Sequence, residues 1–340
     1  MIQMLTEQYR NRWDDYVMAH SDATFFHLSG WQRIIHEAFG HDTYYYYTER
    51  NGKITGILPL VYINSWLFGK SLVSNAFCVY GGIVADEETD FAALHEQARL
   101  LARTLNVDYL EFRHRQQRYL NWPHKTLYVT FRKELSLANG QDSLTLIPQN
   151  QRATVRKAIK AGLISRIDKS IDDFYRAYAE SVRNLGTPIF SKRYFQLIKD
   201  EFADDCEILT VEHQGVLVSS VMSFYFKNEV LPYYGGGTLV ARSLEANAFM
   251  YWEVMKRALD KGYPLFDFGR SKLGTGAYKF KKNLGFDPEP LFYEVDLVSA
   301  KQIPEINPLN PKYQLFIAAW KHLPLSLSIL MGPWLAKDLG

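Results

Sequence analysis

The feature that most constrains the fold of this 340-residue sequence is an order of secondary-structure patterns that occurs twice. In each half, a segment with apolar residues at helical spacing is followed by two strand-like segments around a short turn. The segments are 26–39, 43–48 and 54–63 in the first half, and 190–202, 207–212 and 216–226 in the second. The turns contain Asn51-Gly52-Lys53 and His213-Gln214-Gly215, which favour tight hairpins. This repeat predicts two copies of one structural unit.

The repeat continues with a Gly-Gly pair, a helix and two further strands in each copy. These segments are 79–82, 91–105, 108–112 and 126–132 in the first copy, and 233–236, 244–260, 265–268 and 290–297 in the second. The spacing between the last two strands is longer in the second copy because of an insertion within 270–286. Only this copy carries the glycine- and lysine-rich loop, so we predict that it has specialised for function. An ordinary difference in loop length is the alternative.

The composition is that of a globular protein, with 47% hydrophobic and 22% charged residues. The net charge is +2, so a polyanion would have to be met by a local patch. Cys78 and Cys206 are too few for a disulfide framework or a zinc site and fit a reducing compartment. The histidines lack the spacing of metal ligands, so we expect no metal. With no signal peptide pattern and no apolar run near ~18 residues, we expect a cytoplasmic protein.

The end of the second copy resembles the C-terminal signature of the FemABX family in Phe266-Asp267-Phe268-Gly269-Arg270-Ser271 and in the residues from Gly274 to Phe286. Members of this family transfer amino acids from aminoacyl-tRNA onto peptidoglycan precursors. The sequence is most similar to the FemAB-like proteins associated with exosortase/PEP-CTERM systems. The resemblance implies an α/β fold of the α+β type, with two tandem GNAT-like domains that each contain a twisted mixed sheet flanked by helices. We expect these domains at 1–145 and 146–300, followed by a tail at 301–340.

The resemblance leaves the acyl donor open. The best-known peptidoglycan members carry a long helical arm that is linked to tRNA handling, and no heptad-like segment of that length occurs here. A CoA thioester would place its pyrophosphate on a glycine-rich loop that opens a helix. The corresponding segments are acidic at 85–90 and lack a glycine at 241–247. The donor is therefore an aminoacyl-tRNA or an acyl thioester, and we expect no bound cofactor.

The resemblance implies roles for individual residues of the signature. Phe280 and Lys281 fall where the family signature places the reacting ester, and Lys281 would stabilise negative charge there. The bidentate guanidinium of Arg270 suits a phosphate or a carboxylate. The remaining predicted substrate contacts in the signature are Ser271, Gly274, Gly276 and Tyr278. The alternative for the whole segment is a solvated basic hairpin.

Two further residues are candidates because of the repeat. Asp267 and Glu111 occupy matching strand positions, and Asp267 is a candidate general base for the attacking amine. A structural role shared by both carboxylates explains the match equally well, and the substrate's own phosphate would make a protein base unnecessary. Tyr234 precedes the Gly-Gly pair of the second copy and is a candidate substrate contact.

A basic stripe precedes the second copy. Arg152, Arg156 and Lys160 recur every four residues, so a helix would align them, with Val155, Ile159 and Leu163 on its buried side. Such a stripe suits the diphosphate of a nucleotide- or lipid-linked precursor, or a tRNA backbone, whereas a solvated helix face is the alternative. We expect no DNA partner. The apolar tail at 313–339 suits packing on the domains, which we favour, or peripheral contact with a membrane.

These features together predict a Fem-like N-acyltransferase. It would add an aminoacyl or related acyl group to an amine of a cell-envelope or exopolysaccharide precursor linked to a nucleotide or a lipid. Two alternatives stay open, a CoA-dependent N-acetyltransferase acting on an amino sugar and a non-catalytic scaffold in polysaccharide assembly. The sequence does not determine an oligomeric state.

Overall fold

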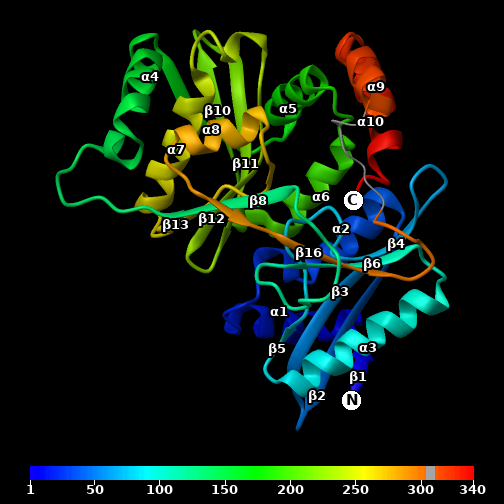
Figure 1. The fold of residues 1–340 in the computed structure, drawn as a ribbon. Helices are drawn as coiled ribbons and strands as arrows, with labels where there is room; N and C mark the ends of the chain where they lie inside the picture. The colour runs from blue at the N-terminus through cyan, green and yellow to red at the C-terminus, as the bar shows by residue number, and fades with distance from the viewer. Residues whose placement is uncertain (304–310) are drawn as a thin grey trace. The chain divides into compact units, whose positions relative to one another are not determined.

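The computed structural model describes residues 1–303 and 311–340, except for the side chains of 311–313. The chain forms two compact units, each discontinuous in sequence (Figure 1). The first unit comprises Met1–Leu127, the described part of Pro290–Ile306, and Ala336–Gly340. The second comprises Tyr128–Glu289 and the described part of Asn307–Leu335.

The first unit is organised by a sheet with the strand order β1-β2-β3-β4-β6-β16-β7, and β5 pairs with β3. Strands β4 and β6 run parallel, whereas the other neighbours are antiparallel. Its elements are β1 (Ile2–Met4), α1 (Arg10–Ala19), α2 (Gly30–Phe39), β2 (Asp42–Arg50), β3 (Lys53–Ser65), β4 (Gly69–Ser74), β5 (Val84–Ala85), α3 (Glu88–Thr104), β6 (Tyr109–His114), β7 (His124–Lys125) and β16 (Phe292–Leu297).

The second unit is organised by a sheet with the strand order β14-β8-β13-β12-β11-β10-β9, and β15 pairs with β8. Both α5 and α7 pack on β11, whose residues 218–226 are continuously buried as expected for a strand covered on both faces. Its elements are β8 (Tyr128–Glu134), α4 (Gln149–Lys160), β9 (Leu163–Asp168), α5 (Asp172–Leu185), α6 (Lys192–Phe202), β10 (Cys206–His213), β11 (Val216–Phe226), β12 (Glu229–Gly237), α7 (Ala246–Asp260), β13 (Leu265–Asp267), β14 (Ser271–Lys272), α8 (Gly276–Asn283), β15 (Pro288–Pro290), α9 (Pro311–Lys321) and α10 (Leu325–Ala336).

The last strand of each unit comes from the other half of the sequence. Strand β8, which we predicted to close the first copy, pairs with β13 through Asp267↔Arg132. Strand β16, which we predicted to close the second copy, pairs with β6 through Val295↔Glu111. The predicted pairing of these strands is therefore wrong, and the units interleave rather than divide at residues 145 and 300. A strand's alternating pattern specifies its buried face, but its backbone groups can pair with any available strand edge.

The predicted repeat is confirmed at the level of element order. Each unit contains a strand, two helices, three antiparallel strands, a helix and a strand that runs parallel to the third. The structure extends the repeat toward the N-terminus, because β1 and α1 correspond to β9 and α5. The predicted match of the Gly-Gly pairs is wrong, since Gly235 and Gly236 lie within β12 whereas Gly81 and Gly82 lie in the loop after β4.

The two predicted hairpin turns have the backbone geometry that their sequences favour. Asn51 and Gly52 have φ of 48° and 73°, and Gln214 and Gly215 have φ of 52° and 75°. Positive φ at both central residues is typical of the two-residue turn that matches the twist of antiparallel strands. The local sequence therefore determines where β2 joins β3 and where β10 joins β11.

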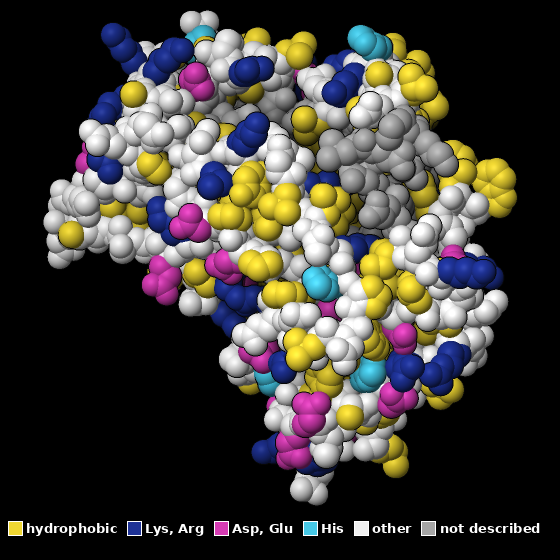
Figure 2. Space-filling model, viewed as in Figure 1, with side chains coloured by type: hydrophobic (Ala, Val, Ile, Leu, Met, Phe, Trp, Pro, Cys, Tyr) yellow, Lys and Arg dark blue, Asp and Glu magenta, His cyan; other side chains and the backbone are white. Residues whose placement is uncertain are grey.

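The C-terminal residues form two helices that pack on the second unit. A Cβ atom at Gly332 of α10 would lie 2.9 Å from Ile189, and Arg183 donates a hydrogen bond to the carbonyl of Leu323 at 3.2 Å. Figure 2 shows hydrophobic side chains on the surface over α9. Among the described residues, no helix combines the length and the apolar character needed to cross a bilayer.

Candidate active site

The second unit contains a parallel strand pair that separates toward its carboxyl ends. Strand β12 continues to Gly237, but its ladder with β13 ends at Val230↔Phe266. Beyond this pair the chain leaves β13 through residues 268–270 and enters β14 and α8. Main-chain N–H and C=O groups of strands that separate need other hydrogen-bond partners, and a ligand can supply them. The signature segment therefore lies where the sheet opens.

The corresponding position in the first unit is closed by the protein's own main chain. The N–H groups of Gly81 and Gly82 both donate to the carbonyl of Arg113 at 3.2 Å. The N–H of Ile83 donates to His114 Nε2 at 3.1 Å. A ligand entering here would have to displace these buried hydrogen bonds. The two copies therefore differ at the end of the parallel pair, and the second is the better candidate for a site.

The segment after β13 forms a short strand and a helix, so the predicted loop or basic hairpin is wrong. Ser271 of β14 pairs with Val129 of β8. The Thr275 hydroxyl caps α8 by accepting a hydrogen bond from the N–H of Tyr278 at 3.3 Å. We interpreted the glycines as marking a loop, but Gly274, with φ of 75°, provides the turn that precedes the capped helix.

Lys281 lies on the buried side of α8, with 9% of its surface exposed. Its amine donates hydrogen bonds to the carbonyl oxygens of Phe268 (2.6 Å), Gly269 (3.0 Å) and Arg270 (3.2 Å). Burial lowers the pKa of Lys281 to about 7, while the charge of Asp267 opposes the shift and that of Arg270 adds to it. An ammonium group has three N–H donors, and these carbonyls engage all three. Lys281 thus holds the main chain at the strand opening.

The predicted role of Lys281 in stabilising charge at a reacting carbonyl stays a prediction. In the observed geometry, an oxyanion would have to replace one of the three main-chain carbonyls. The geometry favours a positioning role, in which the lysine fixes the backbone that borders the site. Phe280, the other predicted residue at the reacting ester, packs with its ring centroid 5.7 Å from that of Tyr251 and 6.5 Å from that of Phe268.

Tyr251 of α7 is a site residue that the sequence analysis missed. Its hydroxyl lies so close to Gly235 of β12 that a Cβ atom there would collide with it. Its ring centroid lies 4.6 Å from that of Phe268, just beyond β13. Tyr251 therefore contacts both of the separated strands. Burial raises its pKa to about 12, so its hydroxyl is protonated at neutral pH. The sequence offers one signal for Tyr251: it lies near the start of a predicted helix that was expected to adjoin the site.

Asp267 is a buried carboxylate with a fixed set of partners. Its Oδ1 accepts a hydrogen bond from the N–H of Gly269 at 2.8 Å, and its Oδ2 lies 3.1 Å from Arg132 Nε. The same guanidinium donates to Glu229 at 2.6 Å. Burial raises the pKa of Glu229 to about 6, the charge of Asp267 adds to the shift, and Arg132 opposes it. The sequence analysis missed Arg132 and Glu229 because Arg132, which links Glu229 to Asp267, lies on the exchanged strand β8.

The matching carboxylate of the first unit is also bound to cations. Glu111 accepts a hydrogen bond from Arg113 Nε at 2.8 Å and forms an ion pair with Lys125. Although burial opposes the shift, Lys125 and Arg113 lower the pKa of Glu111 to about 2. Cation-bound carboxylates at matching positions favour a shared structural role. The assignment of Asp267 as a general base stays a prediction.

The other predicted signature residues lie around β14 and the start of α8. The guanidinium of Arg270 stacks over the ring of Tyr128 at 4.8 Å and is half-buried. Ser271 Oγ is buried and has no hydrogen-bond partner among the described residues. Tyr278 is partly exposed, and its ring meets that of Phe131 edge-on at 5.5 Å. A Cβ atom at Gly276 would meet no atom within 4 Å.

The predicted basic stripe lies on α4. Arg156 and Lys160 are exposed, whereas half-buried Arg152 donates through Nε to the carbonyl of Ile147 at 3.1 Å. Two stripe residues are thus available to an anion. Gly285, which follows α8, contacts Pro148, which precedes α4, so the N-terminus of α4 lies near the C-terminus of α8.

The predicted buried side of α4 is only partly correct. Val155 is fully buried, but Ile159 is 44% exposed and Ala158 is buried in its place. The helix contacts the core through Val155 and Ala158, three residues apart. Leu163, the third residue predicted on this side, is buried but begins β9 rather than continuing α4.

Tyr234 lies in an aromatic cluster with residues of α5 and α6. Its hydroxyl is 2.8 Å from that of Tyr194, and its ring meets that of Phe195 edge-on at 5.1 Å. Burial raises the pKa of Tyr234. A buried and paired hydroxyl fits a structural role, so its predicted contact with a substrate stays a prediction.

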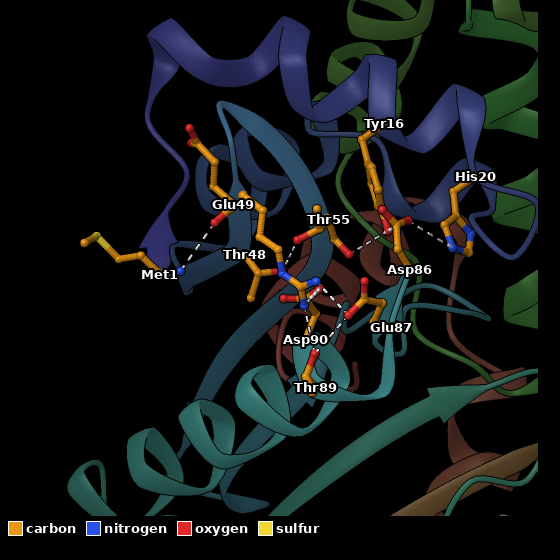
Figure 3. A network of polar contacts seen from close by, with 11 residues as sticks. Met1, Tyr16, His20, Thr48, Glu49, Thr55, Asp86, Glu87, Thr89 and Asp90 are labelled. Carbon is orange, nitrogen blue, oxygen red and sulfur yellow. Dashed lines mark hydrogen bonds and ion pairs between the residues drawn. The ribbon is translucent and has the colours of Figure 1, made fainter.

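The helix N-termini that would hold a pyrophosphate carry acidic residues. At the start of α3, Arg50 forms ion pairs with Glu87 (2.6 Å) and Asp90 (2.9 Å), and Figure 3 shows Glu87, Thr89 and Asp90 gathered there. Helix α7 begins after Glu245, whose φ is 57°. A carboxylate at a helix N-terminus occupies the place where a bound anion would be stabilised. Neither helix start is suited to the pyrophosphate of CoA.

A surface hollow lies elsewhere, on the first unit. It is lined by polar residues of the β3–β4 turn together with Asp108 and Ser299. Asp108 already accepts hydrogen bonds from the N–H of Lys70 and the hydroxyl of Ser299. None of the predicted site residues lines the hollow, so we place the candidate active site at the strand opening of the second unit.

Comparisons with known proteins identify the fold. Residues 149–282 match the acetyltransferase (GNAT) domain family. The crystal structure of FemX is similar with a TM-score of 0.67 and 15% identity, over 93% of this chain and 100% of that chain. A tandem GNAT protein from the clavulanic acid biosynthesis pathway is similar with a TM-score of 0.56 and 12% identity, over 89% and 99% of the two chains.

A third similar structure is the C-terminal domain of a protein described as a lysylphosphatidylglycerol synthetase from Agrobacterium fabrum. Its TM-score is 0.57 at 14% identity, over 85% of this chain and 91% of that chain. No curated protein matches the sequence significantly. The protein therefore has the fold of two tandem GNAT-like acyltransferase domains, as the sequence predicted, and the family match lies within the unit that contains the strand opening.

Proposed function

We propose that this protein is an N-acyltransferase that moves an aminoacyl or related acyl group onto an amine of a cell-envelope or exopolysaccharide precursor. The amine attacks the donor carbonyl and forms a C–N bond. The C–O or C–S bond to the carrier then breaks, and the amine proton passes to the departing oxygen or sulfur. The GNAT domain match and the similarity to FemX support acyl transfer. The link to exopolysaccharide systems rests on the resemblance of the signature alone.

The observation that carries this proposal is the difference between the two copies at the end of their parallel strands. In the first unit, the N–H groups of Gly81, Gly82 and Ile83 fill the position by donating to the carbonyl of Arg113 and to the His114 ring. In the second unit, the strands separate and Lys281 fixes the bordering backbone. Preorganised main-chain groups beside a reacting carbonyl need no rearrangement during the reaction, which lowers its barrier.

The phosphates of the acceptor would bind to cationic side chains of the same unit. Arg270 borders the strand opening, and its stacking on Tyr128 fixes the plane of its guanidinium for bidentate contact. Arg156 and Lys160 are exposed on α4. A nucleotide- or lipid-linked precursor carries a diphosphate that such groups would recognise.

Acetyl-CoA binding tests the nature of the donor. Because Glu245 occupies the start of α7, we expect titration calorimetry with acetyl-CoA to show no saturable binding. Saturable binding that is lost in Arg242→Ala would instead identify a CoA thioester as the donor. Neither outcome contradicts the proposed acyl transfer, because this experiment tests only the identity of the donor.

Acyl transfer is tested with the purified protein and a panel of donors and acceptors. The donors are acetyl-CoA and total tRNA charged with amino acids, and the acceptors are UDP-linked amino sugars and UDP-linked muramoyl peptides. We expect mass spectrometry to detect one acceptor with the added mass of the acyl group. Arg270→Ala should abolish the product, whereas Arg176→Ala, an exposed arginine of α5, should not. Absence of product with every pair, together with unchanged precursor masses in cells lacking the protein, would favour the scaffold alternative.

A further inference from the structure

Helix α10 has the opposite of the usual amphipathic arrangement. Its buried positions hold small residues, Ser328, Gly332 and Ala336. Its exposed positions are spaced i, i+3, i+4 and i+7, which places them on one face, and they are the large apolar residues Leu327, Leu330, Met331 and Trp334. Leu330 is 75% and Trp334 66% exposed. A surface helix normally turns such residues inward, so this face requires a partner.

Helix α10 cannot rotate about its axis to bury its large apolar residues. A Cβ atom at Gly332 would lie 2.9 Å from the main-chain nitrogen of Ile189, so the helix backbone packs directly on the 189 segment. Turning Leu330 or Trp334 inward would force a large side chain into a space that accepts only glycine. The large apolar face is therefore held outward by close packing on the opposite side.

The apolar surface extends beyond α10. On α9, Leu315 is 80% exposed and Phe316 is also exposed. Ile317 of the same helix packs against Gly186, and the adjacent Leu185 at the end of α5 is exposed. The hydrophobic side chains over α9 are visible in Figure 2. Several exposed large apolar residues on consecutive elements exceed the scattered apolar residues of an ordinary surface.

The charge of this segment indicates the chemistry of the partner. Residues 311–337 contain Lys312, Lys321, His322 and Lys337 and no aspartate or glutamate, and the carboxylate of the following Asp338 accepts a hydrogen bond from Ser65 at 2.8 Å. Lys321 is exposed at the end of α9, and the next residue, His322, is also exposed. Large apolar residues accompanied only by cationic groups fit the boundary between the headgroups and acyl chains of an anionic membrane. With 12 residues, α10 is too short to cross a bilayer.

We propose that α9 and α10 form an interfacial anchor that places the second unit on an anionic phospholipid bilayer. The exposed leucines, Met331 and Trp334 enter the headgroup boundary, and Lys321 contacts lipid phosphates. This inference does not rest on acyl transfer, because it concerns a surface distinct from the strand opening. It supplies a reason why a lipid-linked acceptor would meet this protein.

Co-sedimentation of the full chain with vesicles tests the anchor without any donor or acceptor. We expect binding to phosphatidylcholine vesicles that contain about 30 mol % phosphatidylglycerol, and at least roughly tenfold weaker binding to phosphatidylcholine alone. The double variant Leu330→Ser/Trp334→Ser should reduce binding by a factor of about 100. The matched control, Leu100→Ser/Leu120→Ser, changes two exposed leucines of the first unit and should bind as the unaltered protein does.

Brominated lipids provide a second readout that does not depend on overall affinity. They should quench part of the tryptophan fluorescence, and Trp334→Phe should remove that part while binding persists. Trp66→Phe, which changes another highly exposed tryptophan, should leave the quenching intact. The proposal is overturned if neither vesicle binds or if the double variant binds like its control. It is also overturned if light scattering shows a dimer that dissociates in the double variant, because the face would then join two copies of the chain.

Discussion

Replacement of Lys281 by methionine tests the role that the geometry gives to this residue. Methionine keeps much of the aliphatic volume but cannot donate to the carbonyls of Phe268, Gly269 and Arg270. Each hydrogen bond from a charged donor contributes about 1.5–3 kcal/mol, so about 4–9 kcal/mol of favourable interaction is removed. The variant also avoids the cost of burying an ammonium group.

The pKa of Lys281 determines that cost and its dependence on pH. Lowering the pKa from 10.5 to about 7 corresponds to about 5 kcal/mol against the charged form. Between these values the unfolded state binds more protons than the folded state. The free energy of unfolding contributed by this group therefore rises as the pH rises, and the rise ends near the unfolded pKa. At neutral pH, the free energy gained from the three hydrogen bonds is nearly offset by the cost of burying the ammonium group. We therefore expect Lys281→Met to destabilise the protein by only about 2 kcal/mol.

The decisive quantity is the difference in unfolding free energy between the unaltered protein and Lys281→Met. We expect this difference to grow by about 3 kcal/mol between about pH 7 and about pH 9.5. Equilibrium urea unfolding, followed by tryptophan fluorescence, measures it at each pH. The control is Lys282→Met, an exposed neighbour on α8, for which the difference should stay constant. Parallel pH profiles for Lys281→Met and the unaltered protein would refute the inference that Lys281 is buried with a lowered pKa.

Three further predictions concern other parts of the fold. The pKa of Glu229 is raised from 4.5 to about 6, so stability should fall by about 2 kcal/mol as the pH rises through this range, and Glu229→Gln should abolish that fall in urea unfolding. Gly52→Ala should cost about 1 kcal/mol in thermal unfolding because φ is 73° there, whereas Gly276→Ala in open space should cost nothing measurable. Arg156→Gln/Lys160→Gln should raise the KM for a diphosphate-containing acceptor about tenfold and leave kcat unchanged, whereas an unchanged KM would contradict the proposed contact.

The repeat and its hairpins were predictable because their determinants are local. Asn51-Gly52 and Gln214-Gly215 can adopt positive φ at little cost, so short stretches of sequence specify both turns. The apolar spacing of 26–39 and 190–202 likewise indicates α2 and α6 without knowledge of their partners. Two copies of the same local order were sufficient to predict the tandem fold.

The exchange of β8 and β16 was not predictable from the same signals. Both strands have the alternation expected of any half-buried strand, and the choice of partner depends on contacts distant in sequence. The environment of Asp267 was missed for this reason, since Arg132 reaches it from the exchanged strand. The resemblance singled out Lys281, but a signature does not reveal that its amine binds three main-chain carbonyls.

The central claim is that acyl transfer takes place in the second unit and not in its sealed counterpart. The most direct measurement is the mass of the acylated precursor in cells that lack the protein and are supplied with altered forms of it. We predict that the Arg270→Ala form fails to restore the product, whereas Glu88→Gln, at the exposed acidic start of α3, restores it fully. Restoration by Arg270→Ala together with failure of Glu88→Gln would place the chemistry in the first unit and contradict the account.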